Sequence, residues 1–152
     1  MFLVCSQTGE EQVSSIKQAD LARAAATEQM DISRIAQALC VAGKPLSDFD
    51  ALQILTVVEA RSLGMPTAVA QKLVGGLYSE MRHCSCGPER RAWIVFCRRA
   101  GEEFHLSATT HRHLDAILST FPLSQTLPLH ELVERAKERL DGLQTKLAKE
   151  AA

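Results

Sequence analysis

Apolar residues in the first half of the chain recur every three or four positions, which is the spacing of one buried face of an α-helix. Four successive segments show this spacing and together occupy roughly residues 14 to 82. The boundaries carry matching signals: Ser47 or Asp48 can cap the third segment, and Gly64 can close it. The sequence therefore predicts an all-helical front to the chain.

The pattern changes after this front. HCSCGPE reads as a linker, and AWIVFCRR and EEFHLSA then form two β-rich runs on either side of Ala100 and Gly101, which predicts a hairpin. Residues 111–121 return to helical spacing, 124–127 are short and extended, and a long amphipathic helix follows Pro128. We expect a mostly helical α+β fold in three parts: a helix-turn-helix bundle over 1–82, a linker over 83–89, and a small domain of hairpin and helices over 90–152 that ends in the long helix.

Composition limits the classes of protein that fit. Of 152 residues, 46% are hydrophobic and 23% charged, which suits a folded domain. No window approaches the roughly 18 apolar residues of a membrane span, and the apolar start MFLVC breaks off at once, so we expect neither a signal peptide nor an anchor and no membrane partner. Five scattered cysteines favour reduced thiols and a cytoplasmic location.

The stretch LARAAATEQMDISRI has the spacing of two short helices that pack across a tight turn. Five apolar residues would form the shared core: Leu21, Ala22, Ala25, Ile32 and Ile35. Ala26 falls in the turn, where a positive φ would cost an L-residue on the order of 1 kcal/mol. The polar residues of the second helix, Asp31 among them, would point outward. The candidates for contact with a DNA groove about 12 Å wide are Glu28, Gln29, Met30, Ser33, Arg34 and Gln37.

At these residues the chain resembles bacterial helix-turn-helix regulators over roughly residues 17 to 74. ADLARAAATEQMDISRI resembles the motif of Cro-like and MerR-type proteins, and QMDISRIAQAL is similar to the recognition helix of MarR-type proteins. SDFDALQILTVVEARSLGMPTAVAQKL is similar to the helix pair that follows the MerR wing. The resemblance implies a homodimeric, sequence-specific transcription regulator that binds double-stranded DNA, with Gln29, Met30, Ser33 and Arg34 as base or phosphate contacts.

Charge supports an alternative. The net charge is -1, so affinity for DNA must come from a local patch, yet Glu28 and Asp31 are acidic and Arg34 is the only cation on the expected face. The basic wing expected between the recognition helix and the next helix is missing, because only KPLSDF separates them. The second hypothesis is therefore a protein–protein adaptor or antagonist that uses such a motif to dock on another regulatory protein. The simplest interpretation of the stretch is a helical hairpin in an unrelated bundle.

Thiols and imidazoles supply a third hypothesis. His83, Cys84, Cys86 and Cys97 have the soft ligands that zinc prefers, so a metal- or redox-sensing regulator is conceivable. The C-x-C spacing of two of these cysteines is poor for a structural zinc site, and ordinary thiols are the favoured interpretation.

The last helix carries apolar residues at alternating spacings of three and four, as a coiled-coil seam does: Val133, Ala136, Leu140, Leu143 and Leu147. Beyond Gly142 little of the small sheet remains for this helix to cover. We therefore expect a homodimer through Leu140, Leu143 and Leu147.

No catalytic motif is present in the sequence, so we expect no enzyme and no cofactor. His105, His111 and His113 are interpreted as solvated surface residues. The arginines around Trp93 could contact single-stranded bases, but alternation along this strand favours burial on both faces.

Overall fold

The computed structural model describes residues 16–152; residues 1–15, Cys5 among them, lie outside the described residues. Its mostly helical α+β architecture confirms the fold class expected from the sequence. The front consists of α1 (Gln18–Ala24), α2 (Gln29–Ala38), α3 (Asp48–Ser62), α4 (Thr67–Gly76) and α5 (Tyr78–Ser85).

Local signals explain most of the helix boundaries. Ser47 accepts a hydrogen bond from the Asp50 amide at 3.0 Å, and the Asp50 carboxylate accepts one from the Ser47 amide at 3.1 Å. This reciprocal capping box satisfies two amides that have no partner within the helix, and it confirms Ser47 as the N-cap of α3. Gly64, at φ 91°, ends the same helix as expected.

The prediction of a single fourth helix is wrong, because this segment forms two helices, α4 and α5. Gly75 and Gly76 weaken the helix, and Leu77 then leaves helical geometry at φ -112° and ψ 35° to become fully buried. α5 restarts at Tyr78 and runs through Ser85, so the segment expected to be a linker begins inside a helix.

The predicted hairpin is confirmed. β1 (Trp93–Arg99) and β2 (Glu102–Ala108) pair antiparallel, and Ala100 and Gly101 make the connection with φ of 51° and 83°. Two positive φ values in a two-residue loop match the right-handed twist of the strands. The extended segment expected after residue 123 is β3 (Gln125–Pro128), which pairs with β1 to give the sheet order β2-β1-β3.

The sheet lies between two apolar layers, which explains the continuous apolar run of β1. α6 (His111–Thr120) closes one face over Trp93, Val95 and Cys97, while Ile94 belongs to the main core. Trp93 is buried, in agreement with the structural interpretation of this strand and not with a base-stacking role.

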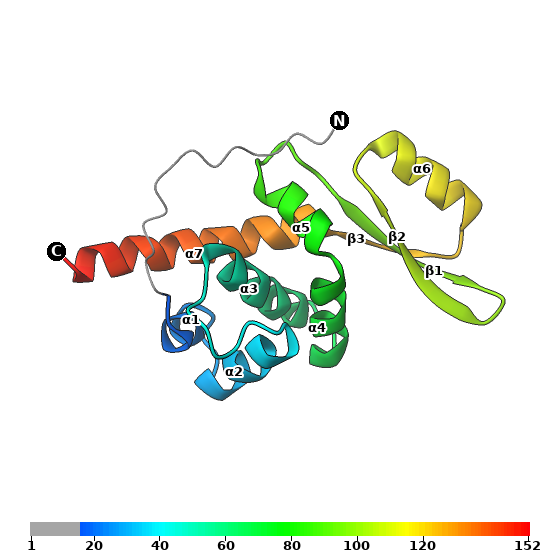
Figure 1. Cartoon of the computed structure of the whole chain (residues 1–152). Coiled ribbons are helices and arrows are strands. Elements are labelled where there is room, and N and C mark those ends of the chain that lie inside the picture. The colour runs from blue at the N-terminus through cyan, green and yellow to red at the C-terminus, as the bar shows by residue number, and fades with distance from the viewer. Residues whose placement is uncertain (1–15) are drawn as a thin grey trace.

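The long helix α7 (Leu129–Glu150) runs back along the N-terminal helical bundle and packs on α3, α5 and α1 (Figure 1). Its apolar seam therefore joins the main core, with Leu140 and Leu143 only 5% and 7% exposed within a single chain, and Leu147 partly buried against the same cluster. The expectation that the distal half of this helix lacks an intramolecular partner is wrong, because Leu143 is buried in the main core and Leu147 packs against it. Leu140 and Leu143 are consequently not available as a dimer seam.

Two cores result, but they do not divide the chain at residues 83–89. The main core combines α1 to α5 with Ile94 and α7, so the C-terminal helix is part of the front bundle. Only the outer face of the sheet and α6 form a separate cluster, and these elements project at one end of the molecule, away from α1 and α2 (Figure 1). Within residues 16–152, no helix has the length and apolar content needed to cross a bilayer.

Candidate nucleic-acid interface

The helices α1 and α2 share the small core that the sequence predicts. Leu21, Ile32 and Ile35 are fully buried, and Ala22 and Ala25 are exposed by only 6% and 8%. Small residues on α1 let α2 approach closely, so that the position of α2 is fixed by packing and not by the turn alone.

The turn between them is a Schellman motif. The Ala26 amide donates to the Arg23 carbonyl at 3.2 Å, and the Thr27 amide donates to the Ala22 carbonyl at 3.0 Å. Ala26 lies at φ 51°, the left-handed conformation that this motif requires and that glycine usually supplies. The positive φ considered for this position in the sequence is therefore present, and the side chain at Ala26 strains the turn.

We expect Ala26→Gly to raise the free energy of unfolding by about 1 kcal/mol, because glycine adopts positive φ without the clash of a Cβ. Urea unfolding followed by circular dichroism measures the change. Gly64→Ala is the matched control, since Gly64 ends α3 in the same way, at φ 91° and with no atom within 4 Å of a new Cβ. It should lower stability by about the same amount. An Ala26→Gly protein less stable than the wild type contradicts the strain assigned to this turn.

The outer face of α2 presents most of the predicted contact residues to solvent. Exposed residues on this face are Glu28, Gln29, Met30, Arg34 and Gln37, whereas Ser33 is half-buried. Met30 is 62% exposed, which is unusual for so large an apolar side chain. Arg34 donates a hydrogen bond to the Met30 sulfur at 3.5 Å, and none of the ion pairs among residues 16–152 involves it. Its guanidinium is thus available to a partner.

Asp31 differs from the sequence expectation. Its carboxylate is half-buried on the flank of α2, where it accepts a hydrogen bond from the Thr27 hydroxyl at 3.1 Å and pairs with Arg61 of α3 at 3.6 Å. One of the two acidic groups that weaken the DNA hypothesis is therefore compensated within the molecule.

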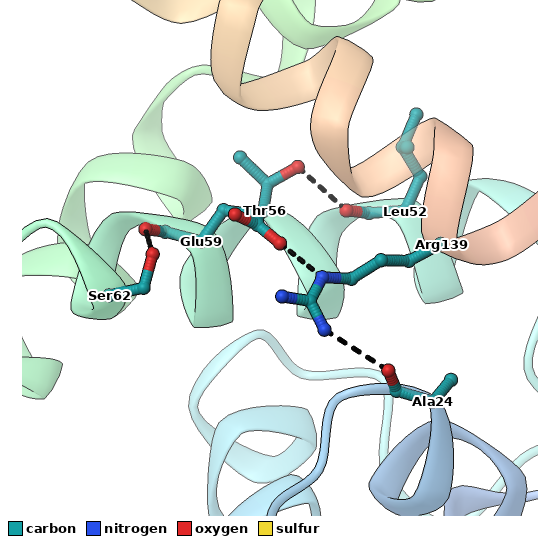
Figure 2. Close-up of polar contacts among 6 residues, drawn as sticks. All are labelled: Ala24, Leu52, Thr56, Glu59, Ser62 and Arg139. Atoms are coloured by element: carbon teal, nitrogen blue, oxygen red, sulfur yellow. Dashed lines mark hydrogen bonds and ion pairs between the residues drawn. The ribbon is translucent and has the colours of Figure 1, made fainter.

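A second arginine fixes α1 against the rest of the bundle (Figure 2). Arg139 of α7 donates through Nε to the carboxylate of Glu59 on α3, and through Nη1 to the Ala24 carbonyl at 3.1 Å. Glu59 is only 4% exposed, and Ala24 is the last residue of α1, directly before the turn. One guanidinium therefore compensates a buried charge and holds the C-terminus of α1.

The thiol and imidazole residues do not assemble into one site. Cys84 lies in the main core and Cys97 in the cluster under α6, while His83 Nε2 lies 3.1 Å from the Arg91 carbonyl oxygen. Among the residues that the structure describes, no three metal-binding side chains lie close enough to share an ion. Burial, and secondarily the carboxylate of Glu80, raises the pKa of Cys84 to about 12, and burial also raises the pKa of Cys97. Neither thiol has the low pKa of a redox sensor.

Thiol labelling should follow this burial. In a Cys5→Ser protein, we expect Ellman's reagent at pH 8 to modify the exposed Cys40 and Cys86 quickly, and Cys84 and Cys97 only on unfolding. Because the folded pKa of Cys84 is raised, the folded state keeps the proton that the unfolded state loses near pH 9. Stability should therefore fall as the pH rises from 9 towards 12. Fast modification of Cys84, identified by peptide mass spectrometry, contradicts this account.

The chain matches no protein-family model, and no curated protein matches it. The candidate interface therefore rests on the geometry of α1 and α2. Sequence reasoning identified the exposed residues of this interface but missed Arg61 and Arg139. Each of the two pairs with a carboxylate distant in sequence, Asp31 and Glu59 respectively, and no local pattern marks such pairs.

Proposed function

We propose that this protein is a transcription regulator that binds double-stranded DNA in sequence-specific fashion, with α2 in the major groove. The observation that carries the proposal is the pairing of α1 and α2 across a left-handed turn. The inner face of α2, with Ile32, Ile35 and Ala36, is buried, while Gln29, Met30 and Arg34 are exposed in the segment 29–34 at the start of this helix. Helix-turn-helix proteins read base edges with this part of the second helix.

Electrostatics on this face supports the proposal. Arg34 has no carboxylate partner among residues 16–152, and Arg61 compensates Asp31, which leaves Glu28 as the uncompensated acid of the predicted set. Gln29 and Gln37 are exposed amides of the kind that pair with adenine, and Arg34 is of the kind that pairs with guanine. The face therefore has the chemistry for direct readout.

We propose further that the regulator works in the cytoplasm and that it is a homodimer. Two recognition helices about 34 Å apart fit successive major grooves on one side of the duplex, which favours two copies per site. The pairing surface must be other than Leu140 and Leu143, which are buried in each chain. Sedimentation of the protein alone and on a duplex gives the number of copies bound.

Substitution on the exposed face tests the proposal. The Arg34→Ala, Gln29→Ala double variant should weaken binding to a selected duplex by at least about tenfold, because each side chain contributes roughly 1 kcal/mol or more of base or phosphate contact. Both residues are exposed, so urea unfolding should show an unchanged fold. The matched control is Arg112→Ala with Gln125→Ala, the same pair of residue types exposed on α6 and β3. Equal loss of affinity in both double variants would exclude α2 as the reading helix.

The exposure of Met30 favours one alternative. A methionine side chain 62% exposed in the first turn of α2, beside Arg34, also suits a protein partner, since methionine and arginine are enriched at protein interfaces. In that case the chain is an adaptor that docks α2 on another regulatory protein. The adaptor would be favoured if the protein binds no duplex at low salt and if the Met30→Ala variant no longer binds a protein partner of the wild type.

A further inference from the structure

We infer that Arg61 of α3 controls the charge that α2 presents to DNA by masking the carboxylate of Asp31. This inference rests on the proposed function and assigns a role to a residue outside the helix that reads the groove. Arg61 is a positioning residue here, since its contact is with Asp31.

The geometry places the pair at the edge of the candidate interface. Asp31 is in the first turn of α2, next to the exposed Met30, and its Oδ2 lies 3.6 Å from Nη2 of Arg61. The two side chains are 35% and 29% exposed, so the pair is accessible to solvent at one side. Thr27 also donates to Oδ2, at 3.1 Å, which holds the carboxylate in place independently of Arg61.

Removing the charge of Arg61 and removing the charge of Asp31 should therefore have opposite effects on the affinity for DNA. Without Arg61, an uncompensated carboxylate remains beside the DNA phosphates and repels them. Without the charge of Asp31, the guanidinium of Arg61 is released at the same edge and gains a phosphate as its partner. A pair that only stabilised the fold would make both substitutions harmful or both neutral for binding.

The test compares Arg61→Ala, Asp31→Asn and their combination by fluorescence anisotropy on one selected duplex at several salt concentrations. We expect Arg61→Ala to weaken binding by about 3- to 10-fold. Asp31→Asn should strengthen binding by a similar factor and steepen the slope of log affinity against log salt by up to about 0.9, the value of one added phosphate contact. The combined variant should bind within about twofold of the wild type, since both charges are gone.

Two controls complete the design. Arg61→Lys keeps the positive charge and should bind close to the wild type. Glu103→Gln breaks the exposed Arg98–Glu103 pair at the hairpin, far from α2 in Figure 1, and should change neither affinity nor slope. Weaker binding by Asp31→Asn, or unchanged binding by both single variants of the pair, overturns the inference while leaving the proposed function standing. A wild-type protein that binds no duplex removes the proposed function itself, and the inference with it.

Discussion

Replacing Leu140 by alanine is expected to lower the free energy of unfolding by about 2 to 5 kcal/mol without changing the mass of the protein in solution relative to the wild type. Leu140 is 5% exposed and lies in the main core, where α7 packs on α3. Truncating its isobutyl side chain to a methyl group leaves a cavity in the part of the helix whose sequence has the spacing of a coiled-coil seam. Urea unfolding gives the stability, and sedimentation velocity gives the mass.

Leu123→Ala is the control for this prediction, because Leu123 is 95% exposed and has almost no packing to lose. Its unfolding midpoint should match that of the wild type. If Leu140→Ala instead shifted a wild-type dimer to monomers at nearly unchanged monomer stability, the seam would bind a second copy and the packing described for α7 would be contradicted.

Replacing Arg139 by alanine is expected to cost about 3 kcal/mol of stability, because it leaves the buried carboxylate of Glu59 without its counter-charge and the Ala24 carbonyl without its donor. The side chain of Glu59 is 5% exposed, so water compensates little of the loss. Introducing Glu59→Gln into the Arg139→Ala protein should recover part of the stability by removing the uncompensated charge. Denaturant unfolding of the four proteins of this double-mutant cycle gives the coupling energy.

The ion pair of Arg98 and Glu103 is the comparison for this prediction, because it is exposed to solvent. Arg98 and Glu103 also form an ion pair, but their side chains are 70% and 72% exposed, so Arg98→Ala should cost less than about 1 kcal/mol. Equal costs for Arg98→Ala and Arg139→Ala would mean that the burial of Glu59 does not determine the strength of the contact.

Local patterns explain why so much of the fold was predictable. The hairpin follows from a two-residue turn at Ala100 and Gly101 between β-rich runs, and the core between α1 and α2 follows from helical spacing alone. Ser47 and Gly64 mark the ends of α3 by their own chemistry. Each of these signals acts over a few residues, so the sequence displays it directly.

The placement of α7 was not predictable in the same way. A helix with an apolar seam can bury it against a second copy or against its own chain, and Leu140 has the same spacing in both cases. The choice depends on where α3 presents a complementary face, which is a property of the folded chain. The pairs of Arg61 with Asp31 and Arg139 with Glu59 were hidden for the same reason. The exposure of the polar face of α2 was therefore predictable from helical spacing, whereas the compensation of the Asp31 charge was not.

The most direct test of the central claim, that α2 presents a DNA-reading face, is fluorescence anisotropy of the purified protein on pooled duplex fragments from its own genomic neighbourhood. The titration is repeated at several salt concentrations. If α2 reads DNA, the protein binds a particular fragment with sub-micromolar affinity, and this affinity falls as salt rises because phosphate contacts release counterions. Absence of binding to every fragment at low salt, from a protein shown to be folded, would contradict this claim.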